Sequence, residues 1–219
     1  LGLANTRGAN GDYLFGGYQV SSKPFTESAT GAVYNGDQGQ RMLQVGAARQ
    51  LSSSDSGSSI FEGGTTGNGR FQTSASTANT GSGLISTGSV TDLSQLTGAK
   101  YDITFSIDAA GATTYLVTQT PPPAIPATPQ PYVSGQAITF DGMTFDVKGV
   151  PANGDTFSVE PSKNQSIFTT ITDLLNVLST STTGEGGKTR LTNGLNTANN
   201  NIDNCLLYTS PSPRDKRQS

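Results

Sequence analysis

The chain of 219 residues contains no histidine, no tryptophan and a single cysteine, and charged residues make up only 13% of it. Without histidine, the Ser-His-Asp and Cys-His arrangements of nucleophilic catalysis and histidine-based zinc sites are excluded. A lone cysteine cannot build a disulfide framework. No apolar run approaches the roughly 20 residues that span a bilayer, and no signal-peptide pattern is visible. We therefore expect no membrane insertion and no cleaved signal peptide.

The polarity of the chain comes from hydroxyl and amide groups rather than from charge. Hydrophobic residues make up 32%, glycines number 27, the formal net charge is -3 and the sequence pI is near 4.8. Disordered chains usually combine low hydrophobicity with high net charge. Because the net charge here is small, the composition fits a β-rich, loop-rich domain of secreted type better than a disordered chain. The acidic balance offers no basic stripe for phosphates, and nucleic-acid binding is not expected. The length fits two modest domains.

Both ends of the chain have unusual patterns. Residues 205–219, CLLYTSPSPRDKRQS, have no apolar periodicity and resemble translated adapter sequence, so we predict a non-native tail; a native disordered terminus is the alternative. Without the tail, the 13 basic and 16 acidic residues fall to 10 and 15, the formal charge falls to -5, and no cysteine is left. Residues 1–7 have the pattern of a helix that begins upstream. We expect an incomplete chain.

Alternation of apolar side chains predicts a hairpin around Gly111. Residues 101–107 alternate strictly, and pairing Ile107 with Thr113 would set Phe105 opposite Tyr115. The large side chains then share one face of the sheet, which we expect to be buried.

A second hairpin is predicted at Asp141-Gly142, a strong two-residue turn signal. Pairing across it sets Phe140 beside Met143, and a last strand is expected around residues 157–159. The proline-rich stretch 121–131 is expected to be a stiff connector, and a ligand for proline-recognition modules is the alternative.

The remaining segments before residue 161 carry weaker signals. Residues 1–62 are expected to hold a helix end, a hairpin and a short helix, with one strand over 41–51. Residues 63–98 are mostly Gly, Ser, Thr and Asn, a composition that suits surface loops or edge strands better than a core.

Beyond Pro161 the apolar period changes to that of a helix. Two amphipathic helices are predicted, with Ser166 as the N-cap of the first. Their apolar stripes form the expected helix-packing interface: Ile167, Ile171, Leu174, Leu178, Leu191, Leu195, Ala198 and Ile202. The second stripe is narrow, as in a coiled-coil seam. The asparagines at 199–201 weaken that helix when it is alone.

Carboxylates are the remaining candidates for chemistry, and most lie in predicted turns. Asp commonly bonds the local backbone there, which we favour over a glycosidase pair. Asp12 and Asp37 lie in loops without the ligand spacing of a calcium loop. Asn164-Gln165-Ser166 matches a glycosylation acceptor but fits a helix cap better. We predict no catalytic residue, no metal site and no cofactor.

Several segments carry a family resemblance when they are taken in order. The opening LGLANTRGANGDYLFGGYQVSSKPF, then YNGDQGQRMLQVG, DSGSSIFEG, VPANGDTFSVEPS and QSIFTTITDLLNVL, are similar to segments of the bacterial flagellar hook-filament junction protein, hook-associated protein 3. The match spans nearly residues 1–204. Each motif alone is unspecific, and their order makes the resemblance specific.

The resemblance implies an α+β fold in which a discontinuous helical domain carries an inserted antiparallel β domain. The corresponding domain limits are 1–62 and 162–204 for the helical parts, 63–161 for the β insertion and 205–219 for the tail. It also implies a structural, non-enzymatic subunit of the extracellular flagellum, exported by the type III apparatus. The implied partners are hook-associated protein 1, flagellin, further copies in a ring and an export chaperone. The family's long terminal helices are absent or truncated in this sequence.

Two other classes of function remain open from the sequence. A carbohydrate-binding or adhesin-like β module is suggested by Tyr101, Tyr115 and Tyr132. A hydrolase that uses pairs of aspartates is the other.

Overall fold

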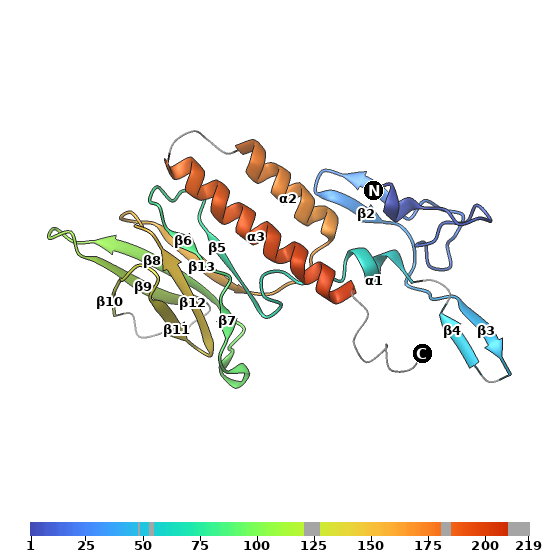
Figure 1. Cartoon of the computed structure of the whole chain (residues 1–219), viewed down its shortest axis with the longest axis horizontal. Helices are drawn as coiled ribbons and strands as arrows, with labels where there is room; N and C mark the ends of the chain where they lie inside the picture. The colour runs from blue at the N-terminus through green and yellow to red at the C-terminus, as the bar shows by residue number, and fades with distance from the viewer. Residues whose placement is uncertain (48, 53–54, 121–127, 181–184, 210–219) are drawn as a thin grey trace. The chain divides into compact units, whose positions relative to one another are not determined.

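The computed structural model describes residues 1–47, 49–52, 55–120, 128–180 and 185–209 (Figure 1). The chain divides into two compact units. The first unit combines Leu1–Gly64 with Asn164–Thr172 and the residues from Cys205 on, and the second unit combines Thr65–Lys163 with Asp173–Asn204. This division groups most of the helical C-terminal part with the β residues. The domain limits expected from the sequence stay a prediction.

The first unit is built from short elements around an aromatic cluster. Its elements are η1 (Leu3–Asn5), β1 (Phe25–Ser28), β2 (Gly31–Tyr34), β3 (Met42–Gly46), β4 (Arg49–Ser52) and α1 (Gly57–Phe61). Strands β1 and β2 form an antiparallel hairpin. The predicted helix end at the start of the chain is a single 3-10 turn.

Phe25 is the centre of the aromatic cluster and is 0% exposed. Its ring lies 5.4 Å from that of Phe61 and 5.2 Å from that of Phe168, measured between centroids. Tyr34 lies 5.0 Å away on the neighbouring strand. Edge-to-face and tilted pairs at these distances add to the free energy of burial. The side chain of Asn5 also pairs with the backbone of Phe25, accepting from its N–H and donating to its carbonyl oxygen.

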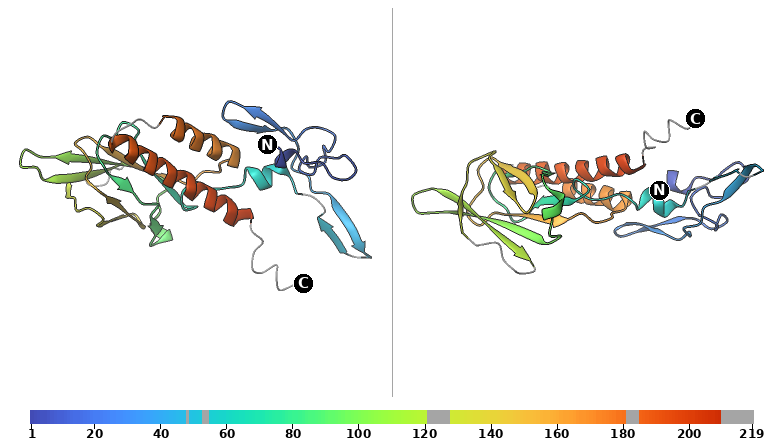
Figure 2. Two further views of the ribbon diagram at one scale, coloured as in Figure 1. Left: turned by 45° about the horizontal axis from the view of Figure 1, so that its top comes forward. Right: turned by 90° about the horizontal axis from the view of Figure 1, so that it is seen from below.

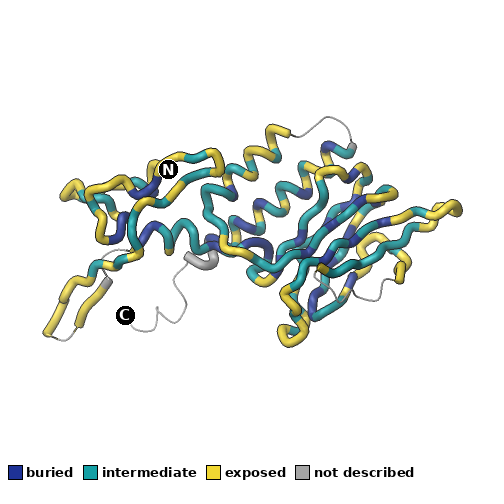
Figure 3. Tube along the Cα trace, turned by 180° about the vertical axis from the view of Figure 1, so that it is seen from behind, coloured by how far each residue is buried: buried dark blue, intermediate teal, exposed yellow. Residues whose placement is uncertain are grey.

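The prediction of a single strand over residues 41–51 is wrong. Strands β3 and β4 instead form a separate hairpin with a register shift between Gln44 and Gly46. Val45 is 50% exposed and Leu51 47%, and Figure 3 shows both strands mostly in the colour of exposed residues. The alternation of apolar residues indicates extended backbone, but the sequence has no Asn-Gly or Asp-Gly turn signal that would divide it into two strands.

The second unit contains two antiparallel sheets. The five-stranded sheet has the order β10-β9-β8-β13-β5, and the other has the order β11-β12-β6 with β7 also paired to β12. The strands are β5 (Phe71–Ala75), β6 (Leu84–Ile85), β7 (Ser89–Val90), β8 (Lys100–Ile107), β9 (Thr113–Thr120), β10 (Gln130–Pro131), β11 (Ala137–Phe140), β12 (Met143–Lys148) and β13 (Thr156–Pro161), with η2 (Leu93–Gln95) between β7 and β8.

Both predicted hairpins are confirmed in their register. Ile107 pairs with Thr113 and Phe105 with Tyr115, and Phe140 pairs with Met143. Asp141 and Gly142 have φ values of 42° and 71°, the left-handed backbone that a two-residue turn requires. The inward side chains of both sheets make one core: Phe71, Ile85, Tyr101, Ile103, Phe105, Ile138, Met143, Phe145, Val147, Phe157 and Val159.

The segment 63–98 contributes more to this core than its composition suggested. It supplies the edge strand β5, as expected, but also the buried Phe71 and Ile85. Polar side chains hold its loops in place of apolar contacts. The buried Asn79 pairs with the backbone of Thr156 through both its amide atoms. Most of the proline-rich connector, 121–127, lies outside the described residues.

Two helices follow the sheets, α2 (Ile167–Thr180) and α3 (Glu185–Thr209), and they run side by side in both views of Figure 2. Ser166 Oγ accepts a hydrogen bond from the Phe168 N–H at 3.3 Å, so the predicted N-cap is confirmed. Helix α3 continues past Asn204 and contains Cys205, which is 8% exposed. The non-native origin of 205–219 stays a prediction.

Candidate functional site

Helix α2 has two different faces. Thr170 is 3% exposed, and Leu174 and Val177, four and seven residues later, are half-buried. The adjacent row, at the same spacing, is Ile171, Leu175 and Leu178, whose exposed fractions are 44%, 59% and 51%. Residues at i, i+4 and i+7 line one side of a helix. Helix α2 therefore presents a continuous apolar stripe on its surface.

The predicted stripe of α2 lies mainly on this exposed side. Ile171 and Leu178 are exposed, while Ile167 and Leu174 at its flank are half-buried. On α3, Leu191, Leu195 and Ile202 are half-buried and Ala198 is 5% exposed. The structure does not bring all eight residues into one contact, so the interface they form together stays a proposal.

Sequence reasoning missed the polar side of α3. Asn193, Asn200, Asn201 and Asn204 all hydrogen-bond to the segment 67–87. Asn193 is 7% exposed and Asn201 6%. The signal in the sequence was a row of asparagines at i, i+7, i+8 and i+11, which has the same period as the apolar stripe.

Two carboxylates at turns accept hydrogen bonds that lower their pKa values. The hydroxyl and the N–H of Ser94 keep the pKa of Asp92 below its ordinary value. The N–H groups of Tyr18 and Gly39 do the same for the pKa of Asp37. Such carboxylates cap turns and stay ionised, which suits a structural role better than proton transfer. Within the described ranges, no three His, Cys, Asp or Glu side chains gather in a group that could hold a metal ion.

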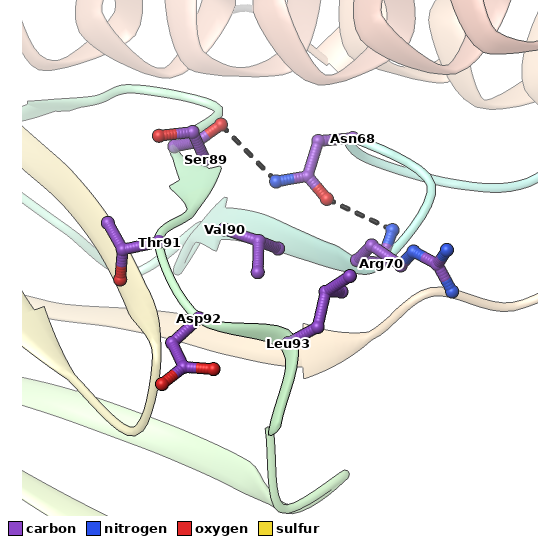
Figure 4. Close-up of a pocket in the computed structure, with 8 residues that line it drawn as sticks. Asn68, Arg70, Ser89, Val90, Thr91, Asp92 and Leu93 are labelled. Atoms are coloured by element: carbon purple, nitrogen blue, oxygen red, sulfur yellow. Dashed lines mark hydrogen bonds between the residues drawn. The ribbon is translucent and has the colours of Figure 1, made fainter. Parts of the chain in front are cut away.

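A groove of about 550 Å³ in the second unit is lined by Asn68, Arg70, Gly88, Ser89, Val90, Thr91, Asp92 and Leu93 (Figure 4). Asn68 spans it, donating to the Gly88 carbonyl at 3.2 Å and accepting from the Arg70 N–H at 3.0 Å. Its one carboxylate, Asp92, already accepts from Ser94 and Gln95. The lining thus offers one exposed cation, Arg70, beside small polar residues and the apolar side chains of Val90 and Leu93.

The three tyrosines that suggest carbohydrate binding are buried or half-buried, and two of them hydrogen-bond within the fold. Tyr101 is 1% exposed, and its hydroxyl donates to Asp141 at 2.6 Å. The Tyr132 hydroxyl contacts the carbonyl oxygens of Val147 and Gly149 at 3.0 and 2.8 Å. Tyr115 is half-buried beside Phe105. A glycan platform needs exposed aromatic faces, so these residues do not favour that alternative.

No helix among the residues that the structure describes combines the length and apolar character of a membrane span.

The family model for the D2-like domain of flagellar hook-associated protein 1 matches residues 74–161, which contain most of the two sheets. No curated protein matches the chain.

Three solved structures are similar along nearly the whole chain. Flagellar hook associated protein-3 from Legionella pneumophila has 34% identity and a TM-score of 0.85, with 94% of this chain and 64% of that chain covered. The flagellar junction protein FlgL from the same organism has 33% identity and a TM-score of 0.83, with 94% and 68% covered. FlgL from Xanthomonas campestris has 30% identity and a TM-score of 0.84, with 94% and 65% covered. The chain thus spans about two thirds of the length of these relatives.

Proposed function

This chain belongs to the family of flagellar junction proteins, FlgL or hook-associated protein 3, and from that premise we propose that it is a structural subunit of the bacterial flagellum. Its place is outside the cell, where it joins the hook to the filament. Its family consists of structural proteins, and we propose that this chain acts by packing and not by catalysis.

One observation carries the proposal: the apolar stripe Ile171, Leu175 and Leu178 on the surface of α2. Each of these side chains is about half exposed, and each leaves apolar area in water that burial would stabilise by roughly 25 cal/mol per Å². Contiguous exposed apolar patches mark contact surfaces, whereas single scattered apolar residues are normal on a protein surface. A row with this spacing can dock into a hydrophobic groove, and we propose that helices of a neighbouring subunit form that groove.

We assign the interface to the two apolar stripes together: Ile167, Ile171, Leu174, Leu178, Leu191, Leu195, Ala198 and Ile202. The proposed partners are hook-associated protein 1 on one side, flagellin on the other and further copies of the chain in a ring. An export chaperone would bind the same helices before assembly. Export through the flagellar type III apparatus, without a cleaved signal peptide, belongs to the proposal. So do the domain limits 1–62, 63–161 and 162–204.

The proposal is tested by exchanging the matching segment of the L. pneumophila junction protein for residues 1–204 of this chain. The chimaera is produced in cells that lack their own junction protein. We expect filaments and swimming to be restored. A triple variant, Ile171→Gln with Leu175→Gln and Leu178→Gln, should be exported and folded but should leave the hooks without filaments.

A matched control changes three exposed polar residues of α3 to glutamine: Thr192, Asn196 and Asn199. Filaments should form normally with this control. Normal filaments with the stripe variant would refute the assignment of the interface. An exported and folded chimaera that never supports filaments would refute the proposed function.

A further inference from the structure

Four asparagines of α3 hydrogen-bond to residues 67–87 of the second unit, mostly to backbone groups. Asn193 accepts from the Ile85 N–H at 3.2 Å and donates to the Gly83 carbonyl at 3.0 Å. Asn201 accepts from the Gly67 N–H at 2.7 Å. Asn204 donates to the Gly67 carbonyl, and Asn200 donates to the Thr87 hydroxyl at 2.5 Å. We call these four residues the asparagine row.

The row closes an open edge of a sheet. Strand β6 is the last strand of the order β11-β12-β6 and pairs with β12 on its other side. The N–H of Ile85 and the carbonyl of Gly83 therefore lack a neighbouring strand, and buried backbone groups without partners are costly. The amide of Asn193 supplies one donor and one acceptor, as a peptide group of a neighbouring strand would. Figure 1 shows α3 running along β6 and β5.

The row also lies opposite the apolar stripe of the same helix. Leu195 follows Asn193 by two residues and Ile202 follows Asn200 by two, which is about 200° around a helix of about 3.6 residues per turn. The side of α3 that faces the sheet edge is thus mainly amide, and the side turned away carries the leucines. Apolar contacts tolerate sliding and rotation, but hydrogen bonds require a fixed distance and angle.

We infer that the asparagine row sets the axial position and rotation of α3 against residues 67–87 of the second unit. The asparagines are positioning residues: they align the helix by pairing with specific backbone groups and with the Thr87 hydroxyl, whereas the side chains of the apolar stripe form no directional bonds of this kind. This inference concerns the fold of the chain and does not rest on the proposed function. The effect of each substitution should be local, because Asn193 pairs with Gly83 and Ile85, Asn200 with the Thr87 hydroxyl, and Asn201 and Asn204 with the peptide groups of Gly67.

Amide hydrogen exchange of the whole chain, followed by NMR, tests the inference at single residues. In Asn193→Leu, which keeps the branching at Cγ and the number of heavy atoms but removes both hydrogen bonds, the Ile85 amide should exchange at least tenfold faster. The amides of Ile103 and Phe157 in the five-stranded sheet should keep their rates. The matched control is Asn196→Leu, at an exposed position of the same helix, and it should leave Ile85 unchanged.

Aspartate variants distinguish a local loss of helix alignment from a general loss of stability. In Asn201→Asp the acceptor oxygen is kept, so the Gly67 amide should stay within about twofold of its original exchange rate. In Asn193→Asp an oxygen replaces the NH2 group that donates to the Gly83 carbonyl. Repulsion between the carboxylate and this carbonyl oxygen should displace the side chain from the Ile85 N–H as well, so the Ile85 amide should exchange at least tenfold faster. Uniform acceleration of all amides in both variants, or no change at Ile85 in either Asn193 variant, would overturn the inference.

Discussion

Gly194 of α3 lies so close to Val177 of α2 that a Cβ at position 194 would stand 2.5 Å from Cγ1 and 2.8 Å from Cγ2 of the valine. Real carbon atoms do not approach to that distance without displacement. The valine is β-branched and has one strongly preferred rotamer in a helix, so it cannot turn aside cheaply. The absence of a side chain at Gly194 therefore permits the close approach of the two helices.

Gly194→Ala should destabilise the chain although alanine is the better helix former. The gain in helix propensity is about 1 kcal/mol, and overpacking against Val177 costs about 1–3 kcal/mol. We expect a net loss of roughly 1 kcal/mol in the free energy of unfolding, measured by urea titration with far-ultraviolet circular dichroism.

Two further variants control this experiment. Gly186→Ala, where the added Cβ would meet the Thr80 carbonyl at an ordinary contact distance of 3.6 Å, should be neutral or stabilising. Val177→Ala in the Gly194→Ala background should recover part of the loss. Equal effects of alanine at positions 186 and 194 would show that the helices are not in close contact there.

The parts of the fold that the sequence predicted best are those with short-range signals. Phe105 faces Tyr115 as expected because strict alternation leaves only one register that buries all large side chains. The Asp141-Gly142 turn was identifiable because few residues adopt left-handed backbone. Ser166 was predicted as a cap from its position directly before an apolar period.

The parts that were missed depend on contacts distant in sequence. Asn193 pairs with Ile85, 108 residues away, and no local pattern identifies which backbone group an asparagine will meet. The division of α2 into a buried row at Thr170 and an exposed row at Ile171 likewise follows from packing that periodicity alone does not orient. Helix propensity ranks asparagine low and therefore predicts a weak helix at residues 199–201, but it takes no account of a partner surface with which the amides can bond.

Phe25→Ala should destabilise the first unit strongly. The fully buried ring contacts three other aromatic rings, and truncation of a buried phenylalanine costs about 3–5 kcal/mol. Amide exchange of residues 15–34 in increasing urea should show unfolding at much lower urea than in the original chain. Leu3→Ala, at a side chain that is 83% exposed, is the control and should change the midpoint little.

The Tyr101 hydroxyl predicts a dependence of stability on alkaline pH. Burial, followed by the hydrogen bond to Asp141, raises the pKa of Tyr101 to about 12 from 10.0. Between these values the unfolded chain has released this proton and the folded chain still holds it. Because the unfolded state then binds fewer protons, the free energy of unfolding falls as the pH rises from 10 towards 12. Below pH 10 the contribution of this group is fully present.

Tyr101→Phe provides the comparison for this pH dependence. Phenylalanine removes the titrating group, so the stability difference between the original chain and the variant should be constant up to about pH 9 and should shrink above pH 10. Thermal unfolding at several pH values measures the difference. A difference that stays constant through pH 11.5 would contradict the assignment. The pKa values of Tyr34, Tyr115 and Tyr132 are also raised by burial, so both chains should keep some slope.

Asp155→Asn should be costly because both carboxylate oxygens of this residue, which is 3% exposed, accept from backbone N–H groups. Oδ1 accepts from Thr80 at 2.9 Å, and Oδ2 accepts from Gly81 at 3.1 Å and from Ala152 at 2.9 Å. An asparagine has a single oxygen, so in either orientation its NH2 group faces at least one N–H donor. Leaving a buried donor without an acceptor costs about 1–3 kcal/mol.

Asp108→Asn is the matched control for this substitution. One oxygen of Asp108 accepts from both the Ala110 and the Ala112 N–H, so the oxygen of an asparagine can keep both bonds at this exposed turn. We expect a change within about 0.5 kcal/mol for this variant, against a loss of at least about 1 kcal/mol for Asp155→Asn, both from urea titration. Similar losses in the two variants would mean that the chain requires charge at these turns and not the number of accepting oxygens. A larger loss at Asp155 would instead tie the stability of the second unit to the two backbone segments that this side chain joins.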